Sequence, residues 1–222
     1  MHSIASLSGR WVRAAVAMAT VAVLGFTAAG TASAQVPAAE KTVTVTVQGA
    51  DLRGFTSLGP DRVQQYLGAK GGTLAQQGIG FNGAYDHIIN NNSNQCLAVP
   101  GGSTADGTGL IQWPCGTWND HYWTANYKFT ESGYYWYQVV NYNSGKCLAV
   151  PGASTTAGTQ VIQWPCGTWR DHYWAFLVDS SNRLHIVNYN SRQCLAIPGA
   201  STDKGAQVIQ WPCGTWADHY WH

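Results

Sequence analysis

The sequence has little charge: Lys, Arg, Asp and Glu make up 10% of its 222 residues, and the formal net charge at pH 7 is +1. A chain without a basic field does not recruit nucleic acid. Its six cysteines never form the Cys-x-x-Cys spacing typical of zinc sites. The repeats that make up most of the chain show no helical periodicity, and after residue 34 no apolar run is long enough to span a membrane. We therefore expect no nucleic acid, no metal, no cofactor and no membrane insertion.

Residues 1–34 have the organisation of a secretory signal peptide. Arg10 and Arg13 form a basic start, residues 14–29 are almost entirely apolar, and residues 32–34 read Ala-Ser-Ala, a typical cleavage pattern. The apolar run is shorter than about 18 residues and is interrupted by threonine and glycine, which disfavours a membrane anchor. We expect export, removal of residues 1–34 and a secreted, monomeric protein. Cleavage leaves ten basic residues (12 minus Arg10 and Arg13) against 11 acidic ones.

Most of the remaining sequence is one segment that occurs three times. The copies occupy residues 96–123, 147–174 and 194–221, and each contains the strings Gln-Trp-Pro-Cys-Gly-Thr-Trp and Asp-His-Tyr-Trp. Their starts are about 50 residues apart, the length of one supersecondary unit. A unit of this size cannot bury its apolar face alone, so the copies must pack on one another.

Each repeat contains four short β-strand signals, separated by clusters of Asn, Ser, Gly and Pro. The signals are an apolar pair before an asparagine, Cys-Leu-Ala-Val/Ile, Leu/Val-Ile-Gln-Trp, and His-Tyr-Trp with its followers. We expect twelve strands in an all-β domain at residues 83–222, with repeats at about 83–127, 134–178 and 183–222. An open stack of three units leaves two apolar edges, whereas a ring leaves none. The pattern favours a closed, pseudo-threefold barrel over a solenoid.

All six cysteines lie in the repeats, two in each and always 19 positions apart. An even number of cysteines in an exported chain indicates disulfides, and six cysteines allow fifteen pairings. Three equivalent bonds require either pairing within each repeat or cyclic pairing between neighbours, such as Cys115 with Cys147. We expect pairing within each repeat, with each bond stabilising by about 3 kcal/mol. The expected pairs are Cys96 with Cys115, Cys147 with Cys166, and Cys194 with Cys213.

Residues 35–82 contain no cysteine and few apolar residues, so we do not expect a second stable domain there. Residues 42–47 alternate like a half-buried strand, and residues 57–67 are compatible with a short helix that has Pro60 near its start. Residues 68–83 are rich in Gly, Gln and Ala, which is typical of a linker. We assign this N-terminal segment no function.

Three tryptophans recur in every repeat, and we expect different roles for them. The ring in the last strand signal is predicted to fill the core: Trp123, Trp174 and Trp221. The other two rings can present a flat apolar face to a ligand, or can simply cover the disulfide. One set stands two residues before the second cysteine: Trp113, Trp164 and Trp211. The other set lies in the loop that follows: Trp118, Trp169 and Trp216.

An Asp-His pair also recurs, with aspartates at Asp120, Asp171 and Asp218 and histidines at His121, His172 and His219. No nucleophile accompanies the pair, and adjacent residues on a strand point to opposite faces, so we do not expect catalysis. A metal site where the three pairs converge on the threefold axis is an alternative. We expect the histidines to make structural hydrogen bonds. The aspartates are expected to face the loops and accept hydrogen bonds from hydroxyls.

Together these motifs resemble the ricin B-type β-trefoil lectins. The resemblance rests on the Asn-x-x-Ser-x-x-Cys-Leu opening, the Val-Pro-Gly turn, the Trp-x-Cys strand end and the closing Trp, and it covers residues 83–222. The chain is similar to the carbohydrate-binding modules of secreted actinobacterial proteins. The resemblance implies a β-trefoil with up to three shallow sugar sites, one in each repeat.

In this family a sugar pocket combines an acid just after Cys-Leu, an aromatic ring two positions before the second cysteine, and a polar residue three before the closing Trp. The ring matches the Trp113 set and the polar residue matches the Asp120 set. The family's acid is absent, because alanine occupies that position in Ala98, Ala149 and Ala196. Loss of a charged acceptor removes about 1.5–3 kcal/mol, enough to abolish a millimolar site unless the Asp120 set has replaced it.

We consider three functions. The leading one is a secreted, non-catalytic carbohydrate-binding protein. The alternative is a protein-interaction trefoil, such as an inhibitor or envelope scaffold with degenerate sugar sites, in which the extra residues near 128–137 contact the partner. An enzyme with its catalytic part at residues 35–82 is disfavoured, because this segment has no paired carboxylates or nucleophile constellation.

Overall fold

A computed structural model describes residues 52–63 and 85–222, which belong to one compact unit, Thr46–His222. The predictions for the signal peptide, for the strand at residues 42–47 and for the linker at residues 68–83 lie outside the described residues. In the two described ranges, no helix has both the length and the apolar character needed to cross a membrane.

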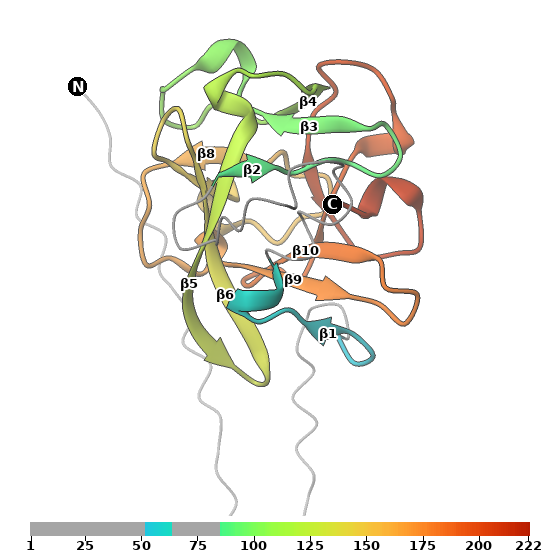
Figure 1. The fold of residues 1–222 in the computed structure, drawn as a ribbon. Coiled ribbons are helices and arrows are strands. Elements are labelled where there is room, and N and C mark those ends of the chain that lie inside the picture. The colour runs from blue at the N-terminus through green and yellow to red at the C-terminus, as the bar shows by residue number, and fades with distance from the viewer. Residues whose placement is uncertain (1–51, 64–84) are drawn as a thin grey trace, which may run out of the picture. The chain divides into compact units, whose positions relative to one another are not determined.

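Twelve antiparallel strands and a set of short turns make up the described fold (Figure 1). One strand precedes the repeats: β1 (Thr56–Ser57). The first repeat contains β2 (Asp86–His87), β3 (Gln95–Ala98), β4 (Ile111–Pro114) and β5 (Tyr122–Glu131). The second contains β6 (Tyr134–Asn141), β7 (Cys147–Ala149), β8 (Ile162–Trp164) and β9 (Trp174–Val178). The third contains β10 (Leu184–Asn188), β11 (Cys194–Ala196) and β12 (Ile209–Trp211).

The strands pair in the order β12-β11-β10-β9-β6-β5-β2, with β1 on β9 and the β7–β8 hairpin on β6. Strands β3 and β4 form a separate hairpin. The prediction of twelve strands in residues 83–222 is one too many for the described part of this range. Near the C-terminus, Trp221 makes isolated bridges to Asn90 and Leu184 and does not belong to a strand.

Each repeat also contains two 3-10 turns. The first begins at a proline: η1 (Pro100–Gly102), η3 (Pro151–Ala153) and η5 (Pro198–Ala200). Its second residue has φ near +60° (61° at Gly101, 59° at Gly152, 62° at Gly199), a left-handed conformation that favours glycine and explains the repeated Pro-Gly pair. The second turn contains the Asp-His pair: η2 (Asn119–His121), η4 (Arg170–His172) and η6 (Ala217–His219). The prediction of a strand that begins at this histidine was therefore wrong.

The three repeats close into a ring. Isolated bridges join successive repeats in cyclic order: Gly109 with Ile162, Gln160 with Ile209, and Gln207 with Ile111. The end of the chain pairs with the start of the first repeat, because the main-chain N–H of His222 donates to Ile89 O at 2.9 Å and that of Ile89 donates to His222 O at 2.7 Å. The prediction of a closed β-trefoil with three pseudo-equivalent repeats is confirmed.

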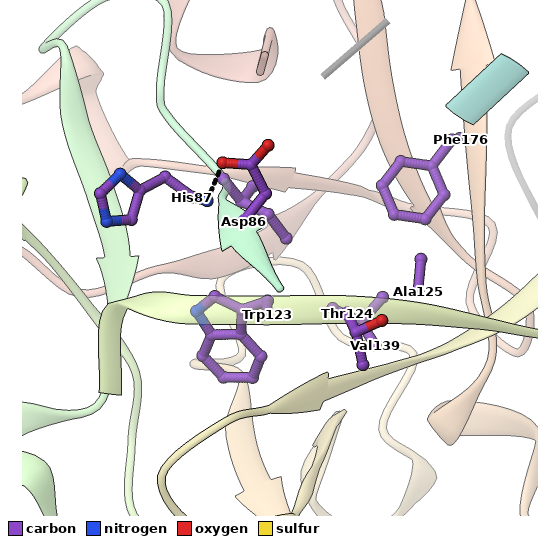
Figure 2. A pocket seen from close by; sticks show the side chains of 8 residues that line it. Asp86, His87, Trp123, Thr124, Ala125, Val139 and Phe176 are labelled. Carbon is purple, nitrogen blue, oxygen red and sulfur yellow. Dashed lines mark hydrogen bonds between the residues drawn. The ribbon is translucent and has the colours of Figure 1, made fainter. Parts of the chain in front are cut away.

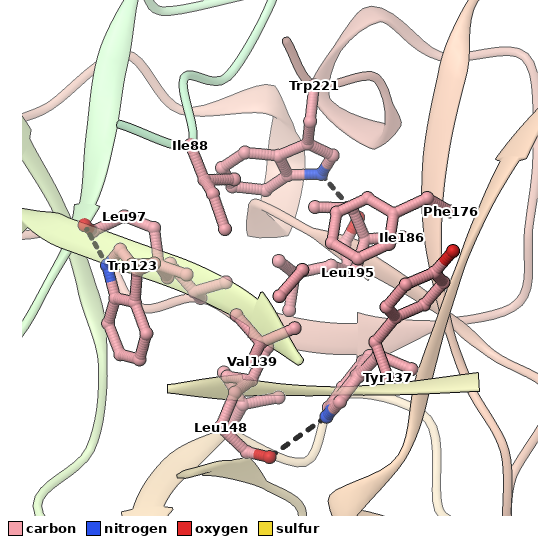
Figure 3. Packing of buried hydrophobic residues seen from close by; sticks show 14 of the residues in the cluster. Ile88, Leu97, Trp123, Tyr137, Val139, Leu148, Phe176, Ile186, Leu195 and Trp221 are labelled. Carbon is pink, nitrogen blue, oxygen red and sulfur yellow. Dashed lines mark hydrogen bonds between the residues drawn. The ribbon is translucent and has the colours of Figure 1, made fainter. Parts of the chain in front are cut away.

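The closing tryptophans lie in the core, as predicted (Figure 3). Trp123, Trp174 and Trp221 are at most 1% exposed. Each indole N–H donates at 2.9–3.0 Å to the main-chain carbonyl of the leucine after the first cysteine: Leu97, Leu148 and Leu195. A buried indole requires such an acceptor, because an unpaired N–H costs free energy. The ring therefore fixes the Cys-Leu strand of its own repeat.

Buried glutamines join neighbouring repeats. Gln112, Gln163 and Gln210 are fully buried, and each amide oxygen accepts from a serine hydroxyl of its own repeat at 2.7–2.8 Å. Each amide nitrogen donates at 2.8–3.0 Å to two carbonyls in a loop of the preceding repeat, in cyclic order. Because a buried amide left unpaired costs about 1–3 kcal/mol, glutamine is required at this position.

The three disulfides pair within the repeats, as expected. They join Cys96 to Cys115, Cys147 to Cys166 and Cys194 to Cys213, with Cα–Cα distances of 4.9–5.0 Å. Each bond ties the first strand of a β-hairpin to the residues just after the second strand. The cyclic alternative is excluded.

Residues 52–63 are packed into the trefoil. Strand β1 pairs with β9, and the side chains of Leu58 and Val63 are 1% exposed in the main apolar core. The hydroxyl of the buried Tyr137 donates to Leu58 O at 2.8 Å. Residues 60–63 are helical, within the range predicted for a short helix. The sequence predicts no second domain in this segment, and the structure shows that its described part, residues 52–63, contributes to the core of the trefoil.

Replacing Leu58 by Ala is expected to lower the free energy of unfolding by about 2–5 kcal/mol, because it leaves a cavity in the trefoil core. Thr56→Ala is the matched control, since Thr56 lies in the same segment with an exposed side chain, and it should change stability by about 0.5 kcal/mol or less. Urea unfolding of the protein without residues 1–34 measures both. A loss below about 1 kcal/mol for Leu58→Ala would contradict the packing of this segment.

His185 is a buried histidine in strand β10. It is 2% exposed, and its Nδ1 atom lies 3.3 Å from the sulfur of Cys194. Its ring packs against Phe55 and Tyr220 at centroid distances of 5.2 and 4.6 Å. Burial lowers the pKa of His185 from 6.5 to about 4, so the folded protein holds this ring neutral.

Stability is expected to fall as the pH falls from about 6.5 towards 4, because the unfolded chain binds a proton at His185 that the folded chain excludes. Between pH 7 and 5 this group alone removes about 2 kcal/mol. His185→Gln, which copies Gln138 of the second repeat, should reduce the drop by that amount, as measured by urea unfolding at both pH values. An identical drop in the variant and the original protein would contradict the assignment.

Candidate functional site

The first and third repeats each form a shallow depression between the Pro-Gly turn and the Asp-His turn. Site 1, in the first repeat, encloses about 600 Å³ and is lined by Ala98, Val99, Pro100, Gly101, Gly102, Ile111, Trp113, Trp118, Asp120 and His121. Site 3, in the third repeat, encloses about 420 Å³ and is lined by the equivalent residues from Ala196 to His219. We call the matching residues of the second repeat site 2; they include Trp164, Trp169, Asp171 and His172. The structure thus brings together the predicted tryptophans and aspartates.

Two indoles form the walls of each site. The first is at the end of a β-hairpin strand: Trp113 is half-buried, whereas Trp164 and Trp211 are 40% and 41% exposed. The second is in the loop after the disulfide: Trp118, Trp169 and Trp216 are 58–59% exposed. Large apolar rings are rarely left so exposed without a binding function. Neither set merely covers a disulfide, because both sets line the open depressions of sites 1 and 3.

The loop tryptophan depends on a glycine two residues before it. A β-carbon at Gly116 would lie 2.0 Å from the ring of Trp118, far inside any van der Waals contact. The same holds for Gly167 against Trp169 and for Gly214 against Trp216. The ring therefore folds back onto the backbone, which explains why Cys-Gly-Thr-Trp is identical in the three repeats.

A nearly buried carboxylate lies between the two indoles. Asp120, Asp171 and Asp218 are 9%, 5% and 5% exposed. Within the described residues, the polar partner of each carboxylate is the neighbouring histidine, whose Nε2 lies 3.6 Å from Oδ2, beyond hydrogen-bond distance. Each carboxylate therefore retains unused acceptor capacity at the lining of an open site. The main chain below it is fixed, because Asn141 Nδ2 donates to Asp120 O at 2.9 Å, with equivalents in the other repeats.

The buried histidine of each turn contacts both the aspartate and the loop tryptophan. His121, His172 and His219 are 3% exposed, and burial, opposed by the adjacent aspartate, lowers their pKa values from 6.5. In the second repeat Nδ1 accepts from the N–H of Gly167 at 3.3 Å, so the ring proton is on Nε2, which faces the aspartate. The loop indole leans over this ring at a centroid distance of 5.1–5.2 Å. The structural hydrogen bond predicted for the three histidines is observed only at His172, whereas Nδ1 of His121 and His219 is buried and has no partner among the described residues.

The alanine at the family's acidic position lines the site. Ala98 and Ala196 contact the depressions of sites 1 and 3 from the Cys-Leu-Ala strand. The only acid in either lining is the aspartate of the Asp-His turn. Each site therefore combines one carboxylate with two indoles.

A loop of the preceding repeat packs against the first tryptophan of each site, and sequence reasoning missed this contact. A β-carbon at Gly205 would lie 3.6 Å from the outer edge of Trp113; the matching contacts are Gly107 with Trp164 and Gly158 with Trp211, both at 3.5 Å. These glycines have φ of +75° to +84°. These glycines occur at the same position in each repeat, and this recurrence was the sequence signal that could have revealed the contact. The tryptophan that each glycine contacts could not be inferred without knowing how the three repeats close into a ring.

Two other features of the described residues are not ligand sites. The crevice between β2 and β5 in Figure 2 is closed, with a volume of about 0 Å³ open to water. In the described part of the chain, the only cluster of three metal-ligating atoms is His87 with Cys96 and Cys115, and these two cysteines form a disulfide. The predicted alternative of three Asp-His pairs meeting on the axis was wrong, because each pair belongs to the depression of its own repeat.

The fold and the sites define a threefold trefoil of the lectin type, and comparison with known proteins agrees. A family model described as ricin-type beta-trefoil lectin domain-like matches residues 79–164 and 122–211, which together span 133 of 222 residues. The chain therefore belongs to the ricin-type β-trefoil lectin-like family. No curated protein matches the sequence.

Solved structures show the same fold. The designed threefold-symmetric protein ThreeFoil is 30% identical with a TM-score of 0.57, over 62% of this chain and 95% of that one. The exo-beta-1,3-galactanase 1,3Gal43A from Clostridium thermocellum is 22% identical with a TM-score of 0.56, over 62% of this chain and 29% of that one. The Polyporus squamosus lectin, bound to the epitope Neu5Aca2-6Galb1-4GlcNAc, is 16% identical with a TM-score of 0.52, over 62% and 47%. The last two show the fold alone.

Replacing Gly116 by Ala is expected to push Trp118 off the backbone and into solvent, because the new β-carbon and the ring cannot occupy the same space. Site-resolved oxidation of tryptophans, read by peptide mass spectrometry, measures the change. Oxidation of Trp118 should rise while that of Trp169 and Trp216 in the same molecule stays constant. Equal oxidation of all three rings in the variant would contradict the proposed contact.

Proposed function

We propose that the protein is a secreted, non-catalytic carbohydrate-binding protein with up to three shallow sugar sites. The observation that supports this most is the composition of each site. Each repeat places an exposed loop indole and a first indole, half-buried at Trp113 and exposed at Trp164 and Trp211, near one nearly buried carboxylate whose acceptor capacity is unused. Three within-repeat disulfides are typical of extracellular proteins and support export.

This composition fits the two faces of a sugar ring. A pyranose presents an apolar C–H face, which stacks on an indole, and a rim of hydroxyl groups, which donate to a carboxylate. In site 1, Trp113 or Trp118 supplies the platform and Asp120 the acceptor. Because burial keeps His121 neutral near pH 7, it does not pair with and neutralise this carboxylate.

The aspartate replaces the acid that the family places after Cys-Leu. With alanine at that position, Asp120 and its equivalents are the only charged acceptors in the linings of sites 1 and 3. A single charge-assisted hydrogen bond contributes about 1.5–3 kcal/mol, so each site alone binds weakly. Three weak sites on one domain gain affinity on a polymer when they bind it together.

The Asp-His pairs do not support catalysis in the described residues. The histidine is 3% exposed and its proton faces an aspartate, and the linings of sites 1 and 3 contain no Ser or Cys nucleophile. Three equivalent small sites are typical of a binding module. The galactanase that shares the fold matches over only 29% of its own chain, which is consistent with such a module attached to an enzyme.

The alternative is a trefoil that binds a protein. The β5–β6 hairpin favours it, because β5 has 10 residues, the longest strand described, and the hairpin exposes 45% of Tyr127. A protein partner need not respect the threefold symmetry, and this hairpin has no equivalent of the same length in the other repeats.

Substitution of Trp113, Trp164 and Trp211 by Ala, singly and together, should reduce retention on glycan arrays and insoluble polysaccharide in steps. Each loss of stacking costs about 0.5–1.5 kcal/mol at its site, or about two- to tenfold. Asp→Asn at the three aspartates should reduce retention further, because a neutral amide is a weaker acceptor.

Tyr127→Ala is the matched control, because it removes an exposed ring away from the three sites. It should leave sugar retention unchanged. Retention that survives the triple Trp→Ala substitution, or that Tyr127→Ala abolishes, would refute the site assignment. Pull-down of a protein that sugars do not displace and Tyr127→Ala does would favour the alternative.

A further inference from the structure

The loop that the preceding repeat places beside the first tryptophan varies between the repeats, and the residue before its glycine differs in charge at the three sites. The residue before the loop glycine is Lys204 beside Trp113 of site 1, Asp106 beside Trp164 of site 2, and Ala157 beside Trp211 of site 3. All three are exposed. The same backbone position thus presents a cation, an anion or a methyl group to otherwise equivalent sites.

Lys204 lies over the ring of Trp113. Its Nζ atom is 5.7 Å from the ring centroid, within the range of a cation–π contact. Trp113 is half-buried, whereas the two equivalent rings are exposed. Within residues 52–63 and 85–222, no carboxylate forms an ion pair with Lys204; the adjacent Asp203 accepts from Ser201 Oγ at 3.3 Å. The ammonium group is therefore available to a ligand.

The Asp106 carboxylate, unlike the Lys204 ammonium group, is not available to a ligand. Its carboxylate pairs with Lys146 Nζ at 2.9 Å. Lys146 occupies the position before the first cysteine, where the other repeats have Gln95 and Gln193, which donate instead to loop carbonyls at 2.6 Å. The Asp106 carboxylate is therefore neutralised by Lys146, the nearby Arg170 guanidinium lies over the Tyr189 ring at 5.1 Å from its centroid, and the Ala157 position beside site 3 has no charge.

We propose that site 1 selects a sugar residue with an anionic substituent, a carboxylate or a sulfate, whereas sites 2 and 3 take neutral sugars. This inference rests on the proposed carbohydrate binding. Because Lys204 Nζ lies 5.7 Å from the centroid of the Trp113 ring, the substituents of a sugar bound at this ring come within reach of the flexible Lys204 side chain. Asp120 belongs to the lining of site 1 and Lys204 does not, so the anion is oriented towards the Lys204 edge and the free hydroxyls towards Asp120.

The test uses single-site proteins, each with the first tryptophan of the other two sites changed to Ala. They are applied to an array that presents neutral glycans beside counterparts of the same backbone with a uronate, a sialate or a sulfate. The site-1 protein should prefer the anionic counterpart by about three- to tenfold, as one partly exposed ionic contact provides. The uronate, sialate and sulfate arms identify the substituent.

Lys204→Ala should reduce this preference ratio to about one, and 0.5 M salt should reduce it in the unchanged site-1 protein. Lys128→Ala, which removes an exposed lysine on the β5–β6 hairpin, should leave the ratio unchanged. In the site-3 protein, Ala157→Lys should create the preference. This gain cannot result from damage to the fold.

The outcomes separate the two proposals. If single-site proteins bind glycans but the site-1 protein shows the same ratio with and without Lys204, the anion selectivity is refuted and the carbohydrate function stands. If the unsubstituted protein binds no glycan on the array, both are refuted.

Discussion

The hydrogen bonds of three buried glutamines are the constraint on which the sites depend. Gln112 donates to Ser201 and Asp203 of the third repeat, and thereby holds the loop that packs on Trp113, the next residue along the chain. The hydrogen bonds that close the ring thus also hold the loop against the first tryptophan of each site. A trefoil that failed to close would leave three amides unpaired, at about 1–3 kcal/mol each, and would separate every first tryptophan from its loop.

Each site is therefore divided between a local and a non-local part. The loop indole, the aspartate and the histidine lie within four residues of one another and are positioned by a glycine and a 3-10 turn. The outer edge of the first indole packs against a loop glycine of the preceding repeat. The local part is the same in all three repeats because its contacts are internal. The non-local part can change one loop residue at a time without disturbing the fold.

The sequence predicts the fold and the local part of the site well, because both depend on repetition. Identical strings indicate identical units, and even cysteine spacing indicates one disulfide per unit, as observed. It did not predict that the Asp-His pair lies in a turn, because four residues of strand-like composition do not reveal a 3-10 conformation. The packing of Leu58 in the core was also missed, since an isolated apolar residue before a proline-led turn has no periodicity.

The distribution of differences among the repeats follows from these contacts. The string Gln-Trp-Pro-Cys-Gly-Thr-Trp is identical in the three repeats and contains the buried glutamine that donates across repeats and the glycine that the loop indole covers, whereas core positions vary among apolar residues, as in Val99, Val150 and Ile197. The residue before the Asp-His pair is Asn119, Arg170 or Ala217, and all three are exposed. The loop residue beside the first tryptophan varies in the same way, yet it is close enough to the site for its charge to act on a ligand. Inside the depressions of sites 1 and 3 the differences are small and apolar, Val99 against Ile197 and Gly102 against Ala200, so the differences in charge between the sites arise at exposed positions along their edges.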